Sequence, residues 1–187
     1  GPSDVALFTL SKLTGHAGTR IGWAITRDAS VAARLHAFVR NAGDIPRENQ
    51  QRALAVLTHL ADQGPGGALL GEALEEMSRR WDALEALFGG SRCYAPQDRG
   101  PALAGDAWSD GAPRRPTPAY VWFECRPAAA LADGETCFDR VLAAGVKGLP
   151  GHYFGDDSGN FMRLELLMRA QAFDLMMQQL EKMQGTC

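Results

Sequence analysis

The sequence predicts an α/β fold, because segments typical of strands alternate with segments typical of helices along its 187 residues. Short apolar runs such as 5–10 and 119–125 have the length and composition of strands. Between them, residues 68–88 carry apolar side chains at helical spacing. The apolar fraction of 45% is that of a globular chain with a real core.

The first half of the chain is predicted to hold two strands and three helices. Val5–Leu10 is apolar except for Thr9, which is typical of a strand covered on both faces. A second apolar strand is expected at 21–25. Three helices follow, over 28–40 with Asp28 or Ser30 as its N-cap, over 46–62, and over 68–88.

The second half is predicted to be a smaller α/β layer. Residues 91–118 are rich in Gly, Pro, Asp and Arg and indicate irregular structure, with an insert at 98–116. Strands are expected at 119–125 and 161–168, and helices at 137–144 and 170–183. The inward positions of the two helices are Phe138, Val141, Leu142, Phe173, Leu175, Met176 and Leu180.

Composition excludes several classes of partner. A net charge of −3 provides no electrostatic basis for binding nucleic acid or an anionic membrane. No apolar run approaches the roughly 20 residues that a membrane span needs. Four histidines and four cysteines lie scattered without ligand spacing, so no metal site is predicted.

The four cysteines also form no C-x-x-C pair, and free, reduced thiols are expected. Reduced thiols suit a cytoplasmic location. Organellar targeting stays open, because Gly1-Pro2 resembles a protease-cleavage scar and a targeting segment would precede it.

The chemistry centres on residues 7–23, LFTLSKLTGHAGTRIGW. A strand ends at Ser11-Lys12, three glycines follow, and Arg20 precedes the next strand. Pyridoxal phosphate needs an amine for a Schiff base, hydroxyl donors for its phosphate, and an arginine fork for that dianion. A lone lysine beside a glycine-rich loop is usually a solvated surface residue. Here, however, the lysine, the hydroxyls and the arginine all belong to one glycine-rich segment between two predicted strands.

This stretch resembles the Schiff-base lysine motif of the alliinase and tryptophan aminotransferase-related family, S-K-x-T-G-H-A-G-[ST]-R-x-G-W, among fold-type I pyridoxal phosphate enzymes. The resemblance implies that Lys12 is the Schiff-base lysine and that Thr9, Ser11 and Arg20 line the phosphate cup. Thr9 and His16 depart from the broader aminotransferase pattern, and both suit the alliinase-like branch.

Arg163 is the second candidate, set among apolar residues in NFMRLEL. A buried guanidinium is usually paired, because an unpaired buried charge is costly. One candidate partner is a neighbouring carboxylate such as Glu165. The other is a substrate carboxylate, and the resemblance favours it, because these enzymes bind the amino acid's α-carboxylate on the corresponding strand.

The resemblance implies the C-terminal part of a fold-type I pyridoxal-phosphate-dependent transferase. Residues 1–89 would be a partial large-domain sheet with a linking helix, and 90–187 the small α/β domain. The implied activity is transamination between an L-amino acid and a 2-oxo acid in a homodimer. C–S lysis and a non-catalytic module serving as a structural or interaction subunit are the alternatives.

Family members place about half their length before the lysine strand, including the aspartate that pairs with the pyridine nitrogen. We therefore expect the N-terminal portion of the same enzyme, or a separate chain, to complete the cofactor site. Without it, the first two strands should expose edges and apolar surface.

Overall fold

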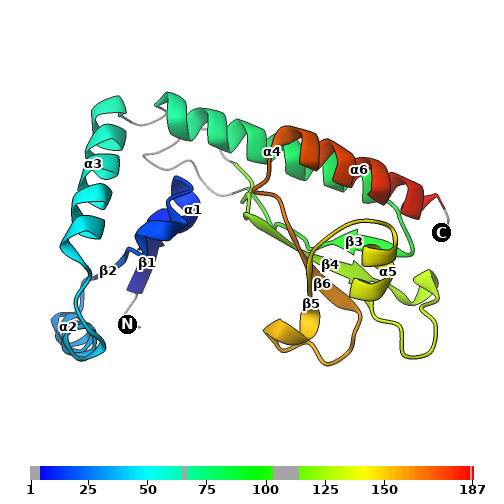
Figure 1. Ribbon diagram of the computed structural model, residues 1–187, viewed down its shortest axis with the longest axis horizontal. Helices are drawn as coiled ribbons and strands as arrows, with labels where there is room; N and C mark the ends of the chain where they lie inside the picture. The colour runs from blue at the N-terminus through cyan, green and yellow to red at the C-terminus, as the bar shows by residue number, and fades with distance from the viewer. Residues whose placement is uncertain (1–4, 65–66, 103–113, 186) are drawn as a thin grey trace. The chain divides into compact units, whose positions relative to one another are not determined.

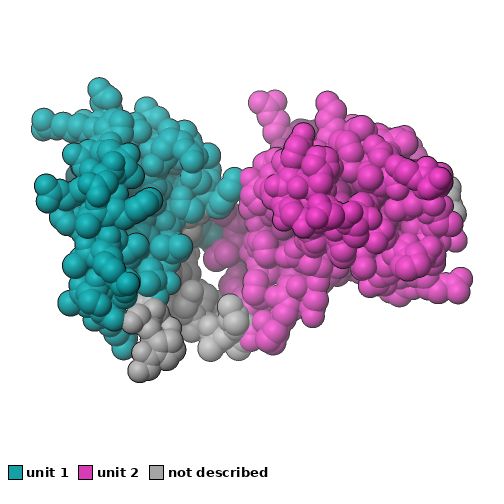
Figure 2. Space-filling model, turned by 90° about the horizontal axis from the view of Figure 1, so that it is seen from below, with its two compact units in different colours: residues 1–71, 106–110 teal, residues 72–105, 111–187 magenta. Residues whose placement is uncertain are grey.

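The structure is a computed structural model that describes residues 5–64, 67–102, 114–185 and 187. The described chain forms two compact units, one up to Gly71 and one from Glu72 onward (Figures 1 and 2). The division falls in the first turn of helix α4 (Ala68–Phe88), upstream of the expected division at Gly89.

The first unit is built on an antiparallel strand pair, β1 (Val5–Thr9) and β2 (Gly22–Thr26). Phe8 lies opposite Trp23, and their rings stack with centroids 5.6 Å apart. The other elements of the unit are α1 (Leu10–Leu13), the 3₁₀ helix η1 (Ala17–Thr19), α2 (Ala29–Ala42) and α3 (Arg47–Gln63). As predicted, the Asp28 carboxylate caps α2, accepting from the N–H groups of Ser30 and Val31.

The expectation that Val5–Leu10 is a buried strand is wrong for the described chain. Every residue of β1 is exposed, with Leu7 77% and Phe8 45% accessible. Only Leu10, which follows the strand, is fully buried. The sheet of this unit has two strands, and the described helices do not bury either face of β1. The predicted exposure of apolar surface is confirmed.

We therefore expect this chain to self-associate when it is purified alone. The exposed apolar side chains of the first unit, Val5, Leu7, Phe8, Ile25, Phe38, Val39, Leu54 and Leu69, leave a surface that favours association. Light scattering across a concentration series should show the mean mass rising above 20.1 kDa. A constant monomer mass at high concentration would contradict this expectation.

The second unit is a four-stranded antiparallel sheet in the order β3-β4-β6-β5, packed beneath α4 and α6 (Figure 1). The strands are β3 (Tyr94–Pro96), β4 (Tyr120–Cys125), β5 (Leu149–Pro150) and β6 (Phe161–Glu165). The helices after α4 are η2 (Pro127–Ala129), α5 (Cys137–Ala143), η3 (Gly151–Phe154) and α6 (Ala170–Gln184). The predicted insert at 98–116 lies largely outside the described residues. Two of its described residues, Arg99 and Arg115, both pair with Glu85.

Strand alternation gives this sheet two different faces. Val121, Phe123, Met162 and Leu164 are fully buried and form the core with α4 and α6. On the helices, two residues that were expected to face inward, Leu142 of α5 and Leu175 of α6, are instead 43% and 57% exposed. The other side chains of β4 and β6, which lie on the opposite face, are half-buried or exposed: Tyr120, Trp122, Glu124, Phe161, Arg163 and Glu165.

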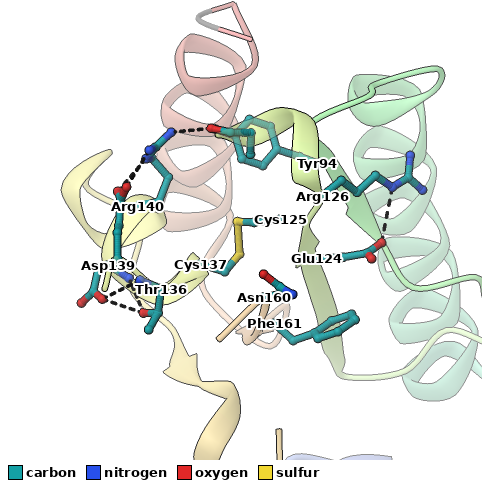
Figure 3. Close-up of a disulfide and its surroundings, with 12 residues drawn as sticks. Tyr94, Glu124, Cys125, Arg126, Thr136, Cys137, Asp139, Arg140, Asn160 and Phe161 are labelled. Atoms are coloured by element: carbon teal, nitrogen blue, oxygen red, sulfur yellow. Dashed lines mark hydrogen bonds and ion pairs between the residues drawn. A yellow bond between two sulfur atoms is a disulfide. The ribbon is translucent and has the colours of Figure 1, made fainter. Parts of the chain in front are cut away.

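The prediction of free thiols is wrong. Cys93 is bonded to Cys187. Cys125 is bonded to Cys137 (Figure 3), and no free cysteine remains. The pairs are 94 and 12 residues apart in the sequence, so spacing did not reveal them. Disulfides persist mainly in oxidising compartments, so the argument from reduced thiols to a cytoplasmic location falls. Among the described residues, no helix is both long and apolar enough to cross a membrane.

Candidate functional site

The segment around Lys12 is a one-turn helix, where the sequence suggested a loop. Thr9 has extended backbone and caps this helix, its hydroxyl oxygen accepting from the Ser11 N–H at 3.1 Å. The Thr9 and Ser11 hydroxyl oxygens also lie 3.1 Å apart. The cap therefore orders the hydroxyls of Thr9 and Ser11, which lie three residues and one residue before Lys12.

The segment closes back on itself between the two strands. The Leu10 N–H donates to the Ile21 carbonyl at 3.2 Å, and the Thr9 hydroxyl lies 3.1 Å from the same oxygen. Arg20 adopts a left-handed backbone (φ 52°), and its guanidinium donates to the Ala17 carbonyl at 3.2 Å. The contacts of Thr9 and Leu10 with Ile21 therefore close the segment into a loop, and this loop contains Lys12 and Arg20.

The donors in this stretch are accessible to a ligand. Ser11 is half-buried, whereas Lys12 and Arg20 are exposed. Gly22 allows β2 to approach β1 closely, since a Cβ there would lie 2.6 Å from the Phe8 carbonyl oxygen. The Thr19 hydroxyl is buried and has no hydrogen-bond partner among the described residues. An amine, hydroxyls and a guanidinium together fit a ligand that carries an aldehyde and a phosphate monoester.

His16 has a structural partner in the same segment. Its Nδ1 lies 2.8 Å from the Thr14 hydroxyl, which donates to the Leu10 carbonyl at 3.3 Å. These contacts tie the glycine-rich turn to the end of α1.

Arg163 lies on β6, on the open face of the second unit's sheet. Its Cζ is 4.1 Å from the Tyr120 ring centroid and 4.4 Å from that of Phe154. Among the described residues it forms no ion pair, and Glu165, which shares its face two residues along, is not its partner. Arg163 is half-buried, less than the sequence suggested.

The two rings beside Arg163 escaped the sequence analysis. The signal that could have found Tyr120 is the register of β4 and β6, since a side chain diagonal to a strand arginine lies within its reach. No such pattern identifies Phe154, because η3 brings it to the sheet from a loop.

Two other features of the second unit lie apart from these residues. A hollow lined by Phe138, Leu149, His152 and Tyr153 contains none of the predicted site residues. Among the residues that the structure describes, no cluster of histidine, cysteine or acidic side chains could hold a metal ion.

Comparison with known proteins identifies the family. The Allinase family model matches residues 2–184. The chain belongs to the Allinase family. Tryptophan aminotransferase-related protein 3 of Arabidopsis thaliana is 30% identical over 96% of this chain. Alliin lyase 2 of Allium sativum is 28% identical, also over 96%. The match covers 37% and 38% of those relatives, so the chain spans little more than a third of their length.

Solved structures confirm the predicted fold class. The N-succinyldiaminopimelate aminotransferase of Mycobacterium tuberculosis matches 96% of this chain with a TM-score of 0.64 at 18% identity. The aspartate aminotransferase of Rhizobium meliloti matches 97% with a TM-score of 0.63 at 18% identity. The chain covers 41% and 42% of these structures. This allinase-family chain thus has the fold of the C-terminal portion of fold-type I aminotransferases.

Proposed function

We propose that this chain supplies the lysine and the carboxylate-binding arginine of a pyridoxal-phosphate-dependent aminotransferase for an L-amino acid. The observation that carries the proposal is the closed segment from Thr9 to Ile21, which gathers an amine, two hydroxyls and a guanidinium. Family membership supports it, since the relatives are aminotransferase-related proteins and lyases.

In this proposal the segment holds the cofactor by complementary chemistry. Lys12 Nζ forms the covalent link, and the Thr9 and Ser11 hydroxyls with the Arg20 guanidinium hold the phosphate. Pyridoxal phosphate, when bound, supplies an electron sink for negative charge at the substrate α-carbon. The rest of its contacts come from the N-terminal portion of the same enzyme or from a second chain.

Arg163 and Lys12 then divide the handling of the substrate. The Arg163 guanidinium, which has no competing carboxylate among the described residues, binds the α-carboxylate through two parallel hydrogen bonds. Lys12 Nζ, as a free amine beside the bound amino acid, would take the α-proton as general base. With the cofactor bound, donation of that proton by Lys12 Nζ away from the α-carbon would be the transfer that transamination to a 2-oxo acid requires.

C–S lysis is the second candidate, because the alliin lyases match this chain about as well as the aminotransferase-related proteins do. The same α-proton transfer precedes both outcomes. Loss of a sulfur substituent from the β-carbon gives lysis, and no described residue selects between them. We further propose that the working enzyme is a homodimer, in keeping with the family resemblance.

The experiment that tests the lysine is labelling with pyridoxal phosphate. The purified chain is incubated with the cofactor, reduced with borohydride and mapped by peptide mass spectrometry. The chain has three lysines, and we expect Lys12 to carry about tenfold more label than exposed Lys147 and Lys182. An absorption band near roughly 420 nm before reduction should accompany the label.

Lys12→Ala and Lys147→Ala are the matched variants. Lys12→Ala should lose both the band and the selective label, and Lys147→Ala should keep both. Label spread evenly over the three lysines would show that this chain alone does not form the cup. It would favour the non-catalytic alternative, in which Lys12→Ala leaves binding to a partner chain unchanged.

A further inference from the structure

We propose that Tyr120 and Phe154 are positioning residues that hold the Arg163 guanidinium so that its N–H groups remain free for a carboxylate. We call this pair the aromatic clamp. The inference rests on the proposed function, in which Arg163 binds the substrate α-carboxylate. It assigns to two aromatic side chains a role that neither sequence spacing nor family membership indicates.

The distances identify both contacts as cation–π interactions. The Arg163 Cζ lies 4.1 Å from the Tyr120 ring centroid and 4.4 Å from the Phe154 ring centroid. Both values are well within the 6 Å at which a guanidinium is attracted to a ring face. A ring face engages the flat side of the guanidinium and uses none of its five N–H donors.

Three other buried or half-buried arginines of this unit are held differently. Arg80, Arg99 and Arg140 each bind a carboxylate, at 2.6 Å in each case for the shortest contact. The Arg163 side chain has no hydrogen bond and no ion pair to any described residue. It is thus oriented by rings in place of carboxylates, as a carboxylate receptor requires.

The sheet places the first ring. Trp122 lies directly opposite Arg163, and Tyr120, two residues earlier on β4, is the diagonal neighbour on the same face. The Tyr120 ring therefore reaches the guanidinium from a strand whose buried face anchors it through Val121 and Phe123. This part of the clamp is rigid because the core holds its strand.

A short loop places the second ring. Phe154 ends η3, where Gly155 turns the backbone with a φ of 85°. The same loop is tied to β6 because the Asp156 carboxylate accepts from the Phe161 N–H at 3.2 Å. Hydrogen bonds from Ser158 and Phe161 to Asp156 outweigh the opposing effect of burial and lower the pKa of this carboxyl group, which keeps the tie charged at neutral pH.

Further rings brace Phe154 from the side. The Trp122 ring lies edge-on to Phe154 with centroids 5.8 Å apart and stacks on Phe161 at 5.7 Å. Phe154 itself is 46% exposed, so this aromatic group forms an accessible surface around Arg163. A carboxylate can approach the guanidinium without displacing any side chain that pairs with it.

The clamp is tested by NMR of the arginine side chains in the intact chain. Ring currents from two faces should move the Arg163 Hε resonance upfield, and Arg163→Lys assigns the signal by removing it. Phe154→Leu should shift this resonance back downfield, whereas Phe154→Tyr and Tyr120→Phe retain a ring and should preserve it. Tyr153→Leu, which removes an adjacent, 67% exposed ring that does not contact Arg163, is the matched control.

Carboxylate binding is measured in the same spectra by adding acetate at constant ionic strength, with acetamide as the neutral probe. We expect acetate, and not acetamide, to shift the Arg163 Nε–Hε signal. Phe154→Leu should raise the acetate dissociation constant about two- to fivefold, the size of one partly exposed cation–π contact. Phe154→Tyr should restore it.

The outcomes separate the two proposals. An Arg163 signal that does not respond to acetate in the unmodified chain contradicts the proposed carboxylate role, whatever the ring-current result. Acetate binding that Phe154→Leu leaves unchanged, with an unmoved Hε resonance, overturns the clamp and leaves the role of Arg163 intact. Equal losses of acetate affinity in Phe154→Leu and Tyr153→Leu would also overturn the clamp. Such a result would show only that acetate binding is sensitive to any substitution in this loop.

Discussion

Removing the Cys93–Cys187 disulfide should lower the free energy of unfolding of the second unit by about 4–5 kcal/mol. The bond joins residues 94 apart, so in the chain-entropy account it strongly restricts the unfolded chain. It links the segment after α4 to the residues after α6, and so ties together the two helices that cover the sheet. Urea unfolding of Cys93→Ala/Cys187→Ala, followed by tryptophan fluorescence, to which buried Trp81 contributes, measures the loss.

Cys125→Ala/Cys137→Ala is the matched comparison. Its bond joins residues 12 apart, for which the same account gives about 3 kcal/mol. The unmodified chain is also measured with reductant, which breaks both bonds but keeps the sulfur atoms, so that the packing lost with the side chains is separated from the loss of the bonds. An equal or reversed order of the two effects would contradict the entropic explanation. If reductant left the free energy of unfolding of the unmodified chain unchanged, this result would contradict the presence of the disulfide bonds.

The second large effect is expected at Arg80, which is only 5% exposed. Its guanidinium donates to the carbonyl oxygens of Leu166 and Met168 and lies 4.9 Å from the Phe173 ring centroid. Arg80→Met should destabilise the second unit by about 3 kcal/mol, because two carbonyls near the core lose their donor. Urea unfolding at pH 7 measures the change.

Arg79→Met is the control, because Arg79 binds the same Glu76 carboxylate but its side chain is 54% exposed. It should cost less than about 1 kcal/mol. Hydrogen bonds from Arg79, and then Arg80, lower the pKa of Glu76 from 4.5 to about 2. The ion pairs therefore stabilise the fold above pH 4.5, and this contribution is lost as the pH falls towards 2. Similar losses in the two variants at pH 7 would contradict the carbonyl explanation.

The order and type of the longer helices and strands could be predicted from local patterns. The helix expected over 68–88 is observed as Ala68–Phe88, and the strand expected at 119–125 as Tyr120–Cys125. Helical and strand periodicity report which residues lie on one face, and this information is local. The depth of burial is not local, and the first strand, Val5–Thr9, is exposed although its composition is that of a core strand.

The candidate site was predictable to a similar extent. The motif around Lys12 identified the residues of the candidate cofactor segment, because they lie close together in the sequence. Hydrogen bonds from Thr9 and Leu10 to Ile21 close this segment. Arg163 was found from its apolar setting, but its alternative partner Glu165 could be excluded only in the structure. Tyr120 and Phe154 come from a different strand and a loop, and no local spacing connects either to Arg163.

By itself, the sequence determined the fold class, the family resemblance and the identity of the charged candidates, since each depends on residues that are neighbours along the chain. The tertiary structure alone decided the cysteine pairing, with partners 12 and 94 residues apart, and the surroundings of Arg163. The physical reason is the same in both cases. Such contacts join segments that only packing of the sheet and its helices brings together, and side-chain chemistry along the chain does not encode which segments meet.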